Sequence, residues 1–163
     1  KLERKYILST EYIIKSAYAK LIRLATHSTY GVASVKTTIL VDQFSPQLAL
    51  DNKDIKQLRT YPSGQALISV PRLDAFTEHA SWLAAQHVQF KEIAGNNAFI
   101  TLSIIIPTNT PIQCPSCSIL FKQHIATQPN VMRLFLLSPV VKLPDVLNSL
   151  NQSHIAIEHV YDY

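Results

Sequence analysis

Two segments of the chain share one pattern, and each predicts a strand, a helix and a second strand. The first covers residues 66–92 and the second covers residues 134–158. In each segment a serine and a proline close the first strand, and a histidine, His87 or His154, opens the second. A strand-helix-strand unit that occurs twice limits the chain to a mixed fold, so we predict an α/β (α+β) architecture.

The composition is that of a globular chain with a basic N-terminal segment. Of the 163 residues, 47% are hydrophobic and 16% are charged, which is enough to bury one sizeable core. Residues 1–36 hold seven basic and two acidic side chains, whereas the remainder holds eight basic and nine acidic ones. Charge therefore does not favour nucleic acid as a partner of the main body.

We expect two parts in the chain. Residues 5–27 place apolar side chains at helical spacing, which predicts an amphipathic helix. We therefore assign residues 1–34 to a basic N-terminal helix and residues 35–163 to a single α/β domain. The helix is a candidate contact for a membrane surface, for a partner or for an adjoining segment, and a solvated helix face is the alternative.

The order of the predicted elements in the middle of the chain suggests a specific fold. The turn at residues 94–97 predicts a hairpin that pairs strand 88–93 with strand 99–106. Residues 66–137 then follow the order β-α-β-β-α-β, which is that of the ferredoxin-like fold, extended by the N-terminal helix and by additional β-α units. The expected strands are 35–42, 66–70, 88–93, 99–106, 132–137 and 155–161, and the expected helices are 46–58, 73–86, 115–127 and 143–151.

Residues 133–161 resemble the opening β-α-β unit of ACT-type regulatory domains. In that family a helix with the spacing Leu-x-x-Val-Leu-x-x-Leu precedes a strand of the type Ile-Asn-Ile-Glu. The resemblance implies a ferredoxin-like fold, small-molecule sensing and dimerisation through sheet edges. The matching residues are Leu143, Val146, Leu147 and Leu150 in the helix and Ile155, Ala156, Ile157 and Glu158 in the strand.

One position departs from the family pattern. The family has a glycine after the proline that precedes the helix, where the backbone of a small ligand docks. Val140 follows Pro139 at this point, and Arg72 follows Pro71 in the first copy. A side chain at this position obstructs close approach of a ligand to the backbone.

The motif with the clearest chemistry is Cys114-Pro115-Ser116-Cys117. A helix over residues 115–127 would place these thiols at its N-terminus, where unpaired N–H groups stabilise a thiolate. Cys114 would then be the attacking thiol and Cys117 the resolving one, as in a thiol-disulfide oxidoreductase. The structural alternative is a local disulfide or an inert thiol pair.

Metal and cofactor sites are not expected. Cys114, Cys117 and His124 would supply three metal ligands, but the sequence has no second Cys-x-x-Cys to close a tetrahedral site. His154 and His159 face opposite sides of a strand and cannot chelate together. The equivalent positions of His87 and His154 predict a capping or turn role at the end of each helix.

These patterns favour a non-catalytic binding or assembly module. We expect a protein partner or a second copy of the chain to bind through the sheet edges. Two alternatives stay open: a thiol-disulfide oxidoreductase that uses Cys114 and Cys117, and a regulatory domain that senses a small molecule.

Overall fold

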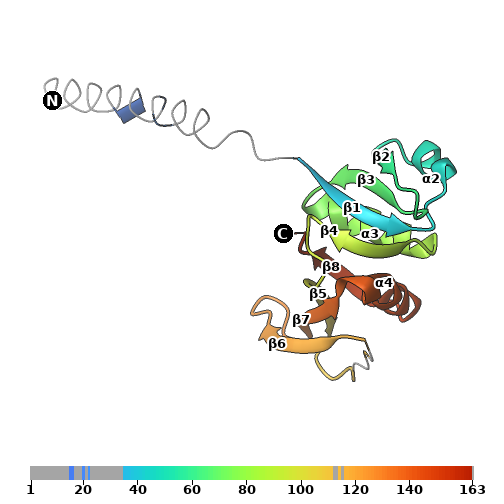
Figure 1. Cartoon of the computed structure of the whole chain (residues 1–163). Helices are drawn as coiled ribbons and strands as arrows, with labels where there is room; N and C mark the ends of the chain where they lie inside the picture. The colour runs from blue at the N-terminus through green and yellow to red at the C-terminus, as the bar shows by residue number, and fades with distance from the viewer. Residues whose placement is uncertain are drawn as a thin grey trace, which may run out of the picture. The chain divides into compact units, whose positions relative to one another are not determined.

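A computed structural model describes residues 35–111, 114 and 116–162, together with four positions of the N-terminal segment. Those four, Lys15, Ser16, Lys20 and Ile22, are helical, while the rest of the helix expected over residues 5–27 lies outside the described residues. The chain divides into units of residues 1–34 and 35–163, and the second holds all the strands that the structure describes (Figure 1). Within the described part, no helix is long and apolar enough to cross a membrane.

The second unit contains two four-stranded antiparallel sheets, so the chain has a mixed α+β fold (Figure 1). The first sheet consists of β1 (Lys36–Asp42), β2 (Lys56–Thr60), β3 (Ala66–Pro71) and β4 (Gln89–Ile93), in the order β2-β3-β1-β4. The second consists of β5 (Phe99–Pro107), β6 (Ser118–His124), β7 (Val131–Pro139) and β8 (Ala156–Val160), in the order β6-β7-β5-β8.

Three helices connect strands of the same sheet. They are α2 (Pro46–Asp51) between β1 and β2, α3 (Asp74–Ala85) between β3 and β4, and α4 (Leu143–Gln152) between β7 and β8. A short 3-10 turn (Val140–Lys142) precedes α4. Helix α2 begins at Pro46 because the Ser45 hydroxyl accepts a hydrogen bond from the Gln47 N–H and proline suits the first helical turn.

The two sheets repeat one arrangement, strand by strand. Strands β1, β2, β3 and β4 occupy the places that β5, β6, β7 and β8 occupy in the second sheet. The register of strand pairing also shifts by one residue at equivalent places in the two sheets. Each paired position in one sheet therefore has a defined counterpart in the other. These interruptions lie between Leu40 and Val41 in β1, Ser103 and Ile104 in β5, Gln57 and Arg59 in β2, and Ile119 and Phe121 in β6.

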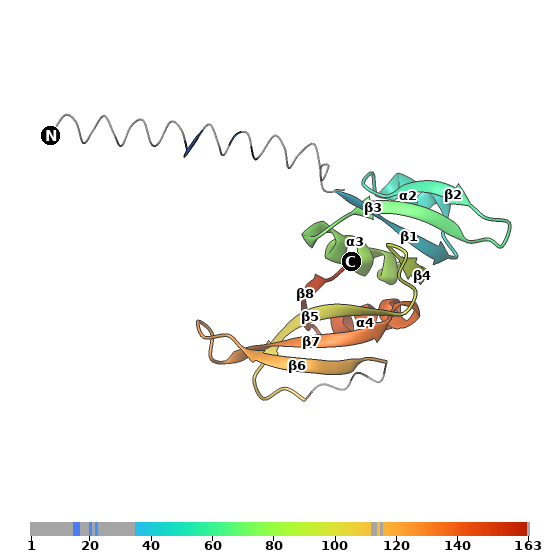
Figure 2. The ribbon, with the colours of Figure 1, turned by 60° about the vertical axis from the view of Figure 1, so that its left-hand side comes forward.

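The core lies where each sheet packs on its helices, and α3 and α4 also pack against each other (Figure 2). The apolar residues at matching positions of the two helices are all buried: Phe76, Ala80 and Leu83 in α3, and Leu143, Leu147 and Leu150 in α4. Polar contacts join the two halves across this layer. The Asn148 side-chain amide donates to the Ala84 carbonyl at 2.9 Å, and the Val160 N–H donates to the Thr77 hydroxyl at 2.8 Å.

Two expectations about the middle of the chain are wrong. The helix expected over residues 115–127 is not formed, because residues 118–124 pair with β7 as strand β6. Strands β4 and β5 do not form a hairpin, because β4 pairs with β1 while both edges of β5 are taken by β7 and β8. The sheet predicted for residues 66–137 is therefore divided between two sheets.

The remaining elements follow the sequence patterns with one exception. The helices predicted over residues 73–86 and 143–151 are confirmed, and so are the six predicted strands. The helix predicted over residues 46–58 ends at Asp51, and the edge strand β2 follows it. The sequence did not predict strand β2, because four of its five residues are exposed and Leu58 is the one apolar residue among them. Such a strand has no alternation of apolar and polar residues.

The turn role of the two equivalent histidines is confirmed. His87 and His154 have φ values of 61° and 54°, in the left-handed region. Their N–H groups donate to the carbonyls of Ala84 and Asn151 at the ends of α3 and α4. Both histidines therefore occupy the left-handed position that ends a helix and is usually a glycine.

We predict that His87→Gly stabilises the protein by about 0.5–1 kcal/mol, because glycine lacks the Cβ that makes this conformation unfavourable. His154→Gly should act in the same direction. Urea unfolding would measure both. The control is His87→Ala, which removes the imidazole but keeps the Cβ. Equal stability of the glycine and alanine variants would contradict this explanation.

Candidate functional site

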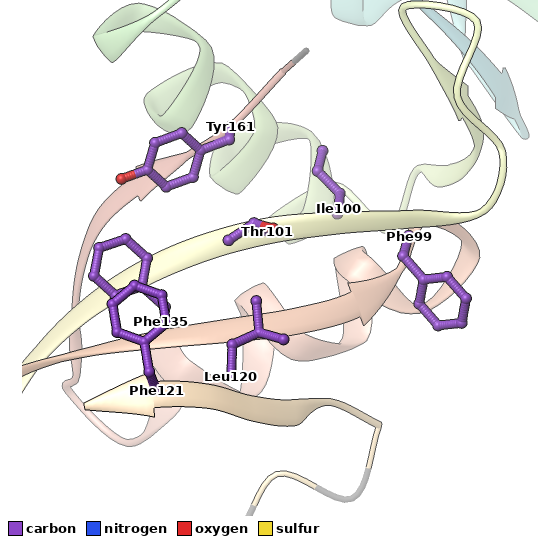
Figure 3. Close-up of a pocket in the computed structure, with 7 residues that line it drawn as sticks. All are labelled: Phe99, Ile100, Thr101, Leu120, Phe121, Phe135 and Tyr161. Atoms are coloured by element: carbon purple, nitrogen blue, oxygen red, sulfur yellow. The ribbon is translucent and has the colours of Figure 1, made fainter.

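The face of the second sheet that points away from α4 carries a group of aromatic side chains (Figure 3). The rings of Phe121 in β6 and Phe135 in β7 stack with their centroids 4.2 Å apart. Tyr161, directly after β8, lies 6.3 Å from Phe135 between ring centroids. Phe99 at the start of β5 adds a fourth ring to this face.

Strand alternation and one irregularity produce this face. In β7, Leu134 and Leu136 are buried on the helix side, so Phe135 between them points to the open side. In β6 the pairing is interrupted at Leu120, and both Leu120 and Phe121 line the open side. An extra residue in an edge strand thus places two consecutive large side chains on one face.

These side chains surround a shallow hollow of about 390 Å³. Its lining is mostly apolar, and hydroxyl groups come from a threonine and a tyrosine. Phe99, Leu120 and Phe121 keep 56%, 48% and 52% of their surface exposed. A cluster of exposed apolar side chains makes this face a candidate interaction surface. The lining residues are Phe99, Ile100, Thr101, Leu120, Phe121, Phe135 and Tyr161.

The first sheet shows that the fold does not require aromatic residues at these places. The register of strand pairing defines a counterpart for each of them, and two of the five counterparts are basic. Because both sheets have the same pairing, the aromatic side chains are not needed to form the sheet. The counterparts are Lys36 for Phe99, Leu58 for Leu120, Arg59 for Phe121, Leu67 for Phe135, and Ala94 for Tyr161.

An ion pair flanks the aromatic group. The Arg133 guanidinium donates two hydrogen bonds to the carboxylate of Glu158 and a third, of 2.9 Å, to the Gln123 side-chain carbonyl. The hydrogen bonds from Arg133 lower the pKa of Glu158 below its ordinary value, although partial burial acts in the opposite direction. The pair is neutral in sum, so it adds no net charge to this face.

We predict that Glu158 contributes pH-dependent stability. A carboxyl whose pKa is lowered by folding contributes stability above its unfolded pKa of about 4.3, and the contribution is lost as the pH falls through the folded pKa. The variant Glu158→Gln lacks this contribution. Unfolding experiments from pH 7 to pH 2 should show a constant stability gap between the two proteins at neutral pH that narrows below about pH 4. A gap that widens on acidification would contradict the ion pair.

The two cysteines predicted as a redox site form a disulfide, with their Cα atoms 5.3 Å apart. They do not lie at a helix N-terminus, because strand β6 begins directly after Cys117. The expectation that a helix dipole stabilises a thiolate at Cys114 is therefore wrong, because a strand and not a helix follows the motif. Both cysteines are half-buried against the core.

The histidines and cysteines do not combine into a metal site in the part of the chain that the structure describes. No group of three His, Cys, Asp or Glu side chains is placed there to hold a metal ion, and this includes Cys114, Cys117 and His124. His159 instead lies 3.4 Å from the carboxylate of Asp74, between Nδ1 and Oδ1.

Sequence reasoning missed the aromatic face. One pattern could have indicated it, because residues 134–137 form an unbroken apolar run within a strand. Such a run gives a strand two apolar faces. When helices cover one face of the sheet only, the other apolar face is left open. No family model matches this chain, and no curated protein or solved structure matches it. The interpretation of the site therefore depends on its geometry.

Proposed function

We propose that the chain is a non-catalytic binding or assembly module whose contact surface is the aromatic face of the second sheet. The observation that carries this proposal is the difference between the two sheets, which share one pairing pattern while only the second has Phe121, Phe135 and Tyr161 at these positions. The partner is a protein surface of apolar chemistry, either another protein or a second copy.

We also propose that each half is a ferredoxin-like unit. The first half has the element order β1-α2-β2-β3-α3-β4, and its strand order β2-β3-β1-β4 supports this topology. The second half lacks a helix between β5 and β6 among its described residues but has the same strand order. This assignment moves the predicted ferredoxin-like core from residues 66–137 to each half of the domain.

Energetics favour contact through the open face. Covering the exposed half of a Phe or Leu side chain contributes roughly 1 kcal/mol to the free energy of binding. Phe99, Leu120 and Phe121 are each about half exposed, so each can make such a contribution. Association through the sheet edges, the original expectation, stays a prediction. The outer strands β2 and β6 are both interrupted by an irregularity, which is a feature that discourages strand addition.

We predict that Leu120→Arg weakens partner binding at least tenfold, because a guanidinium in the hollow must lose its hydration when the face is covered. Peptides selected from a random displayed library against the immobilised chain provide the partner, and fluorescence anisotropy measures the affinity. The same substitution in the first sheet, Leu58→Arg, is the matched control, since Leu58 is the counterpart of Leu120 and is 55% exposed.

The control variant should bind like the unmodified chain. Equal loss in both variants, or no loss in either, would count against the aromatic face as the contact surface. Sedimentation equilibrium of the same three proteins tests whether a second copy is the partner. A concentration-dependent dimer that Leu120→Arg abolishes and Leu58→Arg preserves would identify self-association.

The two alternative functions stay predictions with direct tests. A thiol-disulfide oxidoreductase should lose all turnover of a disulfide substrate when Cys114 is replaced by serine. A sensing domain should gain thermal stability with one class of small molecule through mass action. A binding module predicts neither effect.

A further inference from the structure

The disulfide closes a turn that has a counterpart in the first half of the domain. The equivalent pairing of β2 and β6 aligns Lys56 with Ser118. Counting back along both strands aligns Ile55 with Cys117 and Asn52 with Cys114. The backbone repeats the same hydrogen bond in both turns. The Ile55 N–H donates to the Asn52 carbonyl at 3.1 Å, and the Cys117 N–H donates to the Cys114 carbonyl at 3.3 Å.

The first half holds this turn with side chains. The Asn52 amide nitrogen lies 3.2 Å from Nδ1 of His79 on helix α3. The Asn52 side-chain oxygen also accepts a hydrogen bond of 3.2 Å from the Asp54 N–H. Ile55 is 1% exposed and fixes the start of β2 in the core. Hydrogen bonding and apolar burial thus anchor the turn without a covalent bond.

The described residues of the second half do not repeat these anchors. Ala80 in α3 and Leu147 in α4 are equivalent buried positions. The residues directly before them, His79 and Val146, are therefore counterparts. Valine has no polar group to bind the turn. Cys114 and Val146 line one hollow of about 210 Å³ together with Asp145 and Ser149 of α4, so the turn faces α4 as its counterpart faces α3. The disulfide bond is present where the other half has the asparagine and the isoleucine.

We infer that the Cys114–Cys117 disulfide is a reducible clasp that takes the place of these anchors and holds the start of β6. The agent that opens it is a small dithiol. One thiolate of the dithiol attacks a sulfur of the clasp, the S–S bond breaks, and a mixed disulfide forms. The cysteine whose sulfur was not attacked leaves and takes up a proton. The second thiol of the dithiol then attacks the dithiol's own sulfur in the mixed disulfide and releases the attacked cysteine as the second thiol. Two electrons and two protons pass to the protein, and the dithiol becomes a cyclic disulfide.

The clasp lies next to the aromatic face. Strand β6 begins at Ser118, directly after Cys117, and it carries Leu120 and Phe121 of that face. Cys117 and Phe99 line a second hollow, of about 440 Å³. Reduction should therefore loosen the first residues of β6 and weaken binding there. The part that concerns binding rests on the proposed function, whereas the clasp itself does not.

Amide hydrogen exchange of the full chain, oxidised and reduced with dithiothreitol, tests the clasp. Reduction is verified by titrating two thiols per chain. We expect exchange at residues 117–121 to rise at least tenfold on reduction, with exchange at the counterpart residues 55–59 changed less than twofold. Unchanged exchange at residues 117–121 would overturn the inference. An equal rise in both segments would overturn it as well, because the disulfide would then act on the whole domain.

A transplant of the anchors from the first half provides the second test. The variant Cys114→Asn/Cys117→Ile/Val146→His should keep slow exchange at residues 117–121 and should not respond to dithiothreitol. The variant Cys114→Ser/Cys117→Ser, which removes the bond without new anchors, should exchange as fast as the reduced protein. Slow exchange in the serine variant would overturn the clasp.

Anisotropy with the selected peptides tests the clasp and the binding face separately. Fast exchange with unchanged affinity would leave the clasp standing and would contradict the binding face.

Discussion

The packing of α3 against α4 is the contact on which the arrangement of the domain depends. Each sheet covers one apolar face with its own helix, the two helices pack against each other, and α3 also contacts β8 of the second sheet. The hydrogen bonds from Asn148 to Ala84 and from Val160 to Thr77 are directional, so they fix how the halves meet. With both helix layers used in this contact, the outer face of each sheet remains free to differ.

The two sheets use this freedom differently. Strand order and pairing register are equivalent in both, including the interruptions of β2 and β6. On the open face, however, the first sheet has Arg59 where the second has Phe121. A charged residue is well solvated on an uncovered surface, whereas a half-exposed aromatic ring gains free energy only when something covers it. The repeated fold thus acts as an internal control for the proposed contact surface.

The same comparison changes the meaning of the Cys-x-x-Cys motif. Cys114 and Cys117 repeat the backbone turn of Asn52 and Ile55, which has no thiol chemistry. A short disulfide and a hydrogen-bonded asparagine are two ways of limiting the conformations of one turn. The first can be opened by a change of redox conditions, and the second cannot. This difference gives the second half a chemical sensitivity that the first half lacks.

The sequence alone determined the strand-helix-strand units of each half, because helical and strand periodicities are local and both helices place their apolar residues at matching positions. The equivalence of His87 and His154 was visible for the same reason. Only the tertiary structure decided that residues 118–124 form β6, that β4 and β5 belong to different sheets, and that aromatic side chains share one face. Strand partners are chosen by contacts distant in sequence, and an edge strand with apolar residues in succession has no period that distinguishes it from a helix.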